Sequence, residues 1–175
     1  MNLREYVKDV PGFPQPGIMF RDVTPMLQSP DAFGEVTKCL AKPFWPERTD
    51  NLCVVGIEAR GFIFAAALAR EYRAGFVPVR KAGKLPRRTI KECYSLEYRE
   101  SDVLEIHEDA VRPGQPVLVV DDVLATGGTA IAACKLLKKL GAHLLGCTFV
   151  IELEGLGGRA SLRAMHVPIH SVIKY

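Results

Sequence analysis

Apolar residues in this chain fall into two patterns that alternate from one segment to the next. Short runs rich in valine and isoleucine are typical of strands buried in a sheet, whereas longer segments with apolar residues at helical spacing are typical of helices packed on that sheet. The runs predict strands over residues 52–57, 75–80, 117–121, 144–151 and 169–173, and the longer segments predict helices over residues 31–44, 61–72, 127–140 and 157–164. This alternation predicts an α/β fold with a largely parallel central sheet flanked by helices.

Two parts of the chain depart from the alternation. Residues 1–30 contain five prolines and predict an irregular segment with one short helix. Residues 81–91 are polar and predict a loop, and residues 95–107 alternate well enough to predict a hairpin or two short strands. Because the chain has 175 residues and no linker of biased composition, we expect a single domain over residues 1–175.

The composition, 48% hydrophobic and 25% charged, is that of an ordinary globular protein. No run approaches the roughly 18 apolar residues that cross a bilayer, and the N-terminal segment is charged throughout. We therefore expect a soluble, cytoplasmic protein with no membrane partner. The five cysteines include no C-x-x-C pair and the four histidines have no metal-ligand spacing, so the sequence predicts neither a disulfide framework nor a metal site built by the protein alone.

The segment VLVVDDVLATGGTA, residues 117–130, carries the most informative chemistry. Asp121 and Asp122 end an apolar run, and because burying two unpartnered carboxylates costs several kcal/mol, we expect them to face a cleft. The glycines that follow allow N–H groups to converge at the start of a helix, which favours binding of a phosphate. Carboxylates accept hydrogen bonds from sugar hydroxyls, so the segment predicts a site for a ribose 5-phosphate at the carboxyl end of a strand.

Two further segments could hold a second phosphate group. Residues 58–61, Glu-Ala-Arg-Gly, lie between a predicted strand and a predicted helix, where N–H groups and the Arg60 guanidinium could bind an anion; a charged surface turn is the alternative. Residues 80–91 contain six basic side chains and no acidic one. Such a segment could bind nucleic acid, could be a solvated loop, or could close over a pyrophosphate, and the absence of interleaved aromatic residues favours the last.

The segment at 117–130 resembles the motif with which type I phosphoribosyltransferases bind 5-phosphoribosyl pyrophosphate (PRPP). The segments PGIMFRDVTP, GIEARGFIF, RKAGKLPRRT and YSLEY occur in the order found in family members that act on adenine, so the resemblance covers nearly the whole chain. It implies the single-domain type I fold, with a hood over about residues 1–30 and a flexible lid loop over about residues 81–101. It also implies a pentosyltransferase of purine salvage that converts adenine and PRPP to AMP and pyrophosphate, with Mg²⁺ bound mainly through PRPP or pyrophosphate, and a homodimer.

The resemblance also implies roles for individual residues. Glu97, in the Leu-Glu-Tyr motif near the base, and Arg60 are the expected catalytic residues; a glutamate closed into a dry site would have a raised pKa and could act as a general acid. Arg99 replaces the glycine usual in the family and bears on the hinge of the lid. The ribose and 5-phosphate are expected to contact Asp121, Asp122, Ala125, Thr126, Gly127, Gly128 and Thr129. The pyrophosphate is expected to contact Ala59, Arg60, Arg80, Lys81 and Lys84. The adenine is expected to contact Met19, Phe20, Arg21 and Val123.

Two alternatives stay open on the sequence. The first is a phosphoribosyltransferase that acts on another purine or on a pyrimidine, because only the resemblance of the hood segment favours adenine. The second is a PRPP-sensing regulator that binds nucleic acid, for which an RNA could use a basic face of the domain. The presence of Glu97 in a lid segment favours catalysis, and we expect no nucleic-acid partner.

Overall fold

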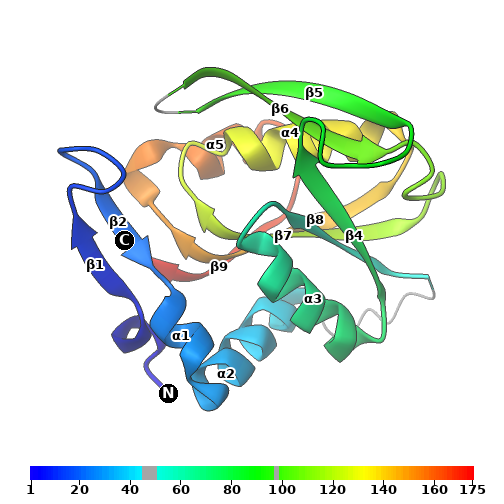
Figure 1. Cartoon of the computed structure of the whole chain (residues 1–175). Helices are drawn as coiled ribbons and strands as arrows, with labels where there is room; N and C mark the ends of the chain where they lie inside the picture. Colours follow the sequence, from blue (N-terminus) through cyan, green and yellow to red (C-terminus); the bar gives the residue numbers. More distant parts are fainter. Residues whose placement is uncertain (45–50, 97–98) are drawn as a thin grey trace.

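The computed structural model describes residues 1–44, 51–96 and 99–175 (Figure 1). A seven-stranded sheet lies at the centre, in the order β5-β6-β4-β3-β7-β8-β9. Parallel pairing joins β4, β3, β7, β8 and β9, and antiparallel pairing joins β4 to β6 and β6 to β5. The bounds are β3 Cys53–Ile57, β4 Gly75–Lys81, β5 Thr89–Leu96, β6 Arg99–His107, β7 Pro116–Leu124, β8 His143–Glu152 and β9 Ile169–Lys174. The predicted α/β fold with a largely parallel sheet is confirmed.

Helices cover both faces of this sheet, and each face has its own apolar core (Figure 1). Alternate residues of a strand point to opposite faces: Leu118 and Val120 of β7 belong to the core under the first three helices, and Val117 and Val119 belong to the core under the last two. Strands covered on both sides read as continuous apolar runs, which is why the sequence located them. The helices are α1 Thr24–Gln28, α2 Pro30–Ala41, α3 Gly61–Tyr72, α4 Gly128–Lys139 and α5 Gly158–Arg163.

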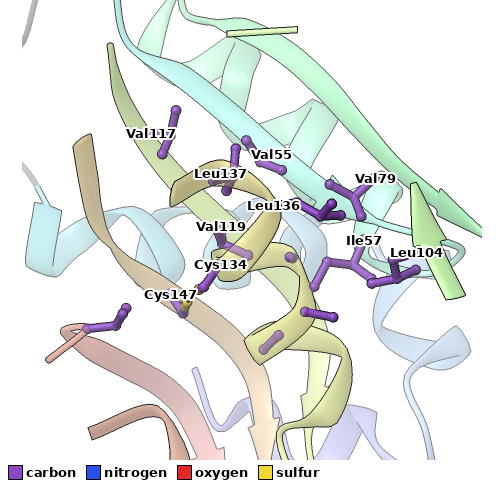
Figure 2. Close-up of a cluster of buried hydrophobic side chains, with 14 of the residues drawn as sticks. Val55, Ile57, Val79, Leu104, Val117, Val119, Cys134, Leu136, Leu137 and Cys147 are labelled. Atoms are coloured by element: carbon purple, nitrogen blue, oxygen red, sulfur yellow. Dashed lines mark hydrogen bonds between the residues drawn. The ribbon is translucent and has the colours of Figure 1, made fainter. Parts of the chain in front are cut away.

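The core under α4 is closely packed (Figure 2). Cys134 of α4 lies beside Cys147 of β8, with their Sγ atoms 3.5 Å apart as free thiols. Leu136 and Leu137 of α4 are fully buried in the same core. Gly141 follows the helix with φ +75°, a left-handed conformation that favours glycine and fits the predicted end of this helix.

The N-terminal segment contains a hairpin that the sequence analysis missed. Strands β1 (Lys8–Pro11) and β2 (Met19–Asp22) pair antiparallel, between a 3₁₀ turn at Leu3–Tyr6 and α1. All four residues of β1 are exposed. Without a buried face there is no apolar alternation to detect, and the prolines suggested an irregular segment. We call residues 8–22 the hood hairpin.

The predicted loop over residues 81–91 is wrong from Thr89 onward, because β5 begins there and pairs with β6 in a long hairpin. Ile90 and Tyr94 pack into the core under α4, and Glu92 between them pairs with two lysines of that helix. This period of two was present in the sequence, but the surrounding charges obscured it. Among the described residues, no helix combines the length and apolarity needed to cross a membrane. The cytoplasmic location stays a prediction.

Candidate functional site

A cavity of about 630 Å³ lies between the hood hairpin and the carboxyl ends of β3, β4 and β7. It is the place where an open parallel sheet usually binds its ligands. The cavity brings together eleven of the residues expected from the sequence, which come from four separate segments. They are Met19, Phe20, Arg21, Ala59, Arg60, Lys81, Asp121, Asp122, Val123, Ala125 and Thr129.

Two adjacent carboxylates form the floor of the cavity. Asp121 and Asp122 are only 7% and 5% exposed, and β7 continues past them to Leu124 instead of ending there as expected. Burial, together with the neighbouring charge of Asp122, raises the pKa of Asp121 well above its usual range. Asp122 accepts a hydrogen bond from Arg60 Nε, and its backbone N–H donates to Asp121 Oδ1 at 2.9 Å. In this pair the charge of Asp122 is compensated by Arg60, whereas Asp121 takes up a proton more readily than an exposed carboxyl does. The arrangement is suited to hydrogen bonding with the two hydroxyls of a sugar diol.

The residues after β7 turn sharply into α4. Gly127 has φ +86°, which the absence of a side chain permits, and the twelve-residue helix begins at Gly128. The first N–H groups of a helix have no partner within it and favour an anion. Ala125 and Thr129 line the cavity. Thr126, Gly127 and Gly128 do not line it, and they form the turn that sets its shape. We call residues 125–129 the phosphate loop.

Residues 58–61 connect β3 to α3 on the same rim. Arg60 is half-exposed; besides its pairing with Asp122, its guanidinium lies 5.1 Å from the centre of the Phe20 ring, so it joins the hood to the sheet. Gly61 begins α3 against β7, because a Cβ there would lie 2.7 Å from Asp121 Oδ1 and 2.9 Å from Val120 O. The glycine thus allows this loop to approach the carboxylates closely.

The basic residues at the end of β4 differ in their surroundings. Lys81 lines the cavity, with its Nζ 3.7 Å from Asp102. Arg80 does not line it and donates to both carboxylate oxygens of Glu58 at 3.2 Å, and to Lys84 O at 3.0 Å. Burial pulls the pKa of Glu58 upward, but the hydrogen bonds from the Lys81 N–H and from Arg80 hold that pKa below its usual value. Lys84 also lies outside the cavity lining.

The sequence pattern of the phosphoribosyl transferase domain matches residues 27–163. The chain belongs to the phosphoribosyltransferase family, in its adenine phosphoribosyltransferase branch. The adenine phosphoribosyltransferase of Jannaschia sp. (strain CCS1) is 52% identical over 174 residues, which are 99% of this chain and 96% of that relative. The predicted membership of the family is therefore confirmed.

Solved structures of the family are similar over nearly the whole chain. The adenine phosphoribosyltransferase of Rhodothermus marinus is 48% identical, with a TM-score of 0.92 over 99% of this chain and 96% of that one. The enzyme of Saccharomyces cerevisiae, solved with D-2,5-dideoxy-2,5-imino-altritol 1,6-bisphosphate and adenine, is 40% identical, with a TM-score of 0.89 over 97% of this chain and 96% of that one. The chain thus has the type I phosphoribosyltransferase fold.

Other lining residues were not predicted from the sequence. Glu58 was part of the loop after β3, but its partner Arg80 could not be foreseen. Leu153 follows the end of β8, and the rule that ligands bind at strand ends could have indicated it. The remaining lining residues are Phe13, Pro14, Ile18 and Tyr94. The expected catalytic residue Glu97 lies outside the described residues, and its role stays a prediction.

Proposed function

We propose that this phosphoribosyltransferase transfers the 5-phosphoribosyl group of PRPP to adenine, giving AMP and pyrophosphate, as the names of its relatives indicate. One observation carries the proposal: a single cavity joins a buried carboxylate pair, a helix start that favours phosphate, and an apolar hood. These parts suit a ribose, its phosphate and a flat base, respectively. The proposal takes residues 1–175 as one domain, since the hood, the sheet ends and the region about residues 81–101 contribute to this one site.

Different residues bind different groups of the substrate. Asp121 and Asp122 bind the ribose hydroxyls, and the N–H groups of the phosphate loop bind the 5-phosphate. In the reaction the bond from C1 of the ribose to pyrophosphate breaks, the bond from C1 to N9 of adenine forms, and the N9 proton leaves. No protein nucleophile is required. Catalysis comes from holding both ends of PRPP and from excluding water, which would otherwise hydrolyse it.

The pyrophosphate binds at the rim formed by residues 58–61 and the end of β4. Ala59, Arg60 and Lys81 line the cavity there. Lys81 is half-exposed and its pair with Asp102 is long, so it can turn towards an incoming anion at little cost. Arg60 is also half-exposed, and it can reach the anion while its Nε stays on the buried Asp122, which would be costly to leave unpaired. Two cations at this position stabilise the negative charge that grows on the departing group. Arg80 and Lys84 act from outside the lining, where Arg80 holds Glu58 in place.

Adenine binds between the hood and β7. Met19 and Phe20 cover it from the hood, Val123 supports it from the strand, and the backbone of Arg21 reads its 6-amino group. The edge contact of Phe13 with Phe20, at 5.0 Å between ring centres, stabilises this wall. Glu97 is proposed to exchange a proton with the base at N7, on the basis of its place in the Leu-Glu-Tyr motif.

The cavity fits Mg²⁺ that arrives with PRPP. Its carboxylates are Glu58, Asp121 and Asp122, of which Glu58 is engaged by Arg80 and Asp122 by Arg60. Within the described ranges, no cluster of three metal-ligating side chains occurs. Mg²⁺ often keeps few protein ligands and binds through substrate phosphates, where it neutralises charge on the leaving group. We therefore propose that phosphate oxygens supply most of its ligands here.

We also propose a homodimer that uses the exposed apolar side chains of α3 and β4. Ile63 is 41% exposed and Phe76 is 39% exposed, and the ring centres of Phe76 and Phe62 are 5.8 Å apart. Exposed apolar groups that gather on neighbouring elements often mark an interface. Light scattering after size exclusion should give twice the mass of the chain for the wild type, and the variant Phe76→Glu should shift the mass towards that of one chain.

The deciding experiment measures pyrophosphate release from PRPP and Mg²⁺, with adenine, hypoxanthine, guanine, xanthine or uracil offered separately. Release with adenine alone is the expected result. Release with another base would retain the ribose and phosphate assignments and overturn those of the hood. Binding of PRPP without release for any base would instead indicate a regulator.

A further inference from the structure

Gly158, the first residue of α5, lies directly behind the phosphate loop. Its N–H donates to Ala125 O at 3.0 Å, and its Cα lies 3.2 Å from the position that a Cβ on Gly127 would take. A Cβ on Gly158 itself would lie 2.3 Å from Ala125 O and 3.0 Å from Gly127 N. The backbone of Gly158 does not have a positive φ, so contact with the phosphate loop, and not conformation, restricts this position to glycine.

A buried ion pair fixes the helix that carries Gly158. Arg159 donates through Nε to Glu152 Oε1 at 2.6 Å and through Nη2 to Oε2 of the same carboxylate. The Glu152 side chain is only 2% exposed. Arg159 also donates to Ile169 O at 3.4 Å and to Ser171 Oγ at 3.3 Å. The fork of one guanidinium thus joins α5 to the end of β8 and to the first half of β9.

The same ion pair lies next to the strand that leads into the phosphate loop. Glu152 is opposite Leu124, the last residue of β7, and the N–H of Leu153 donates to Leu124 O at 2.9 Å. The hydrogen bonds from Arg159 hold the pKa of Glu152 below its usual value, so the carboxylate is charged at neutral pH. The phosphate loop is therefore attached at its beginning through β8 and supported from behind through α5.

We propose that Glu152, Arg159 and Gly158 are positioning residues for the 5-phosphate of the substrate. The ion pair holds α5 on the sheet, and Gly158 in turn holds residues 125–127 in the curve from which their N–H groups point at the phosphate. None of the three lines the cavity, so they act through the phosphate loop. The inference rests on the proposed function, because it needs a phosphate at that loop.

Gly158→Ala is the sharpest perturbation of this support. The added methyl group would stand about 1 Å inside ordinary contact distance of Ala125 O, which is backbone and can only move with the loop. Displacements of this size at a binding group change rates or affinities by up to about 100-fold. Because residues 58–61 and Lys81 are not touched, binding of pyrophosphate should stay unchanged.

Calorimetric titration with ribose 5-phosphate, and separately with pyrophosphate and Mg²⁺, tests the inference without requiring turnover. We expect Gly158→Ala to weaken ribose 5-phosphate binding by roughly 10- to 100-fold with no change for pyrophosphate. Arg159→Lys keeps the charge but loses the fork, so it should weaken binding of ribose 5-phosphate in the same selective way. Arg87→Ala is the matched control, because it removes the exposed pair of Arg87 with Asp109, and neither residue lines the cavity or pairs with Glu152 or Arg159.

The outcomes separate the inference from the proposed function. If the wild type binds ribose 5-phosphate and the folded Gly158→Ala and Arg159→Lys variants bind it equally well, the inference is wrong and the proposed function stands. If Gly158→Ala does not fold, Arg159→Lys alone decides between these results. If the wild type itself does not bind ribose 5-phosphate, both the inference and the proposed function are wrong.

Discussion

The aromatic ring of Tyr175 attaches the hood hairpin to the end of β9. The Arg21 guanidinium carbon lies 3.9 Å from the ring centre, and that of Arg4 lies 4.4 Å from it. Figure 1 shows this end of the chain close to β2. Arg21 also pairs with Asp9 across the hairpin, and it lines the cavity. We therefore predict that Tyr175 determines how firmly the hood covers the base.

The binding free energy that should be lost when the Tyr175 ring is removed follows from the burial of the two cations. A cation–π contact contributes about 0.5–1 kcal/mol when exposed and about 2 kcal/mol when desolvated. The Arg21 side chain is only 18% exposed, which places its contact towards the upper value, whereas Arg4 is exposed. Tyr175→Leu keeps the apolar bulk and loses the ring face, so it should cost roughly 1–2 kcal/mol, or about 5- to 30-fold in binding.

Steady-state kinetics at varied adenine and varied PRPP provide the assay. We expect Tyr175→Leu to raise KM for adenine by about 5- to 30-fold. KM for PRPP should rise less, because among the described residues no hydrogen bond or ion pair joins the phosphate loop to the hood hairpin, and only Arg60, through Phe20, links the hood to the pyrophosphate site. Tyr175→Phe retains the ring face and serves as the control, with values near those of the wild type. An unchanged KM for adenine in Tyr175→Leu, or an equal rise in both KM values, would refute this account of the hood.

Three further predictions concern stability and the pyrophosphate site. Burial raises the pKa of Asp121 in the folded protein above its value in the unfolded chain. Protonated Asp121 therefore stabilises the folded state in acid, and this stabilisation is lost as the pH rises through the folded-state pKa. Asp121→Asn should raise Tm at neutral pH and make Tm depend less on pH. Gly61→Ala should cost about 1–3 kcal/mol in urea unfolding, whereas Gly34→Ala on α2, where a Cβ meets nothing within 4 Å, should not destabilise the protein. Lys81→Ala should raise KM for PRPP, and Arg87→Ala, on an exposed pair outside the cavity, should not.

The sequence revealed most clearly the strands that are buried on both faces. Strands β3 and β7 lie between two cores, so their apolar runs were unambiguous. The strands of the hood hairpin are held by backbone pairing and by the contact of Phe13 with Phe20, and neither leaves a periodic pattern in the sequence. Tertiary pairing determines such elements, and local composition does not.

The candidate site was predictable where its chemistry is local. Asp121, Asp122 and the phosphate loop are consecutive, so one short segment displays both the acceptors and the anion site. Contacts between distant segments were not predictable. Gly158, which supports that loop, lies 31 positions after Gly127 in the sequence, and only folding brings the two backbones into contact.

The basic segment over residues 80–91 illustrates the same limit and bears on the remaining alternative. Carboxylates from other segments pair with five of its six basic side chains: Glu58, Asp102, Asp109, Glu108 and Glu105. Nucleic-acid affinity depends on how many phosphates are neutralised by lysine and arginine, and pairing within the protein reduces the positive charge that an RNA would meet.

Binding of a pyrophosphate requires fewer basic side chains of this segment than binding of an RNA does. It needs only cations that already line the cavity, and Lys81 does so while paired loosely with Asp102 at 3.7 Å. A long pair with a half-exposed lysine contributes about 0–1 kcal/mol, so an anion carrying several charges can displace Asp102. The pairing thus favours catalysis over RNA binding. Tight RNA binding that weakens steeply with added salt and is abolished by substituting Arg87 and Arg88 would reverse this conclusion.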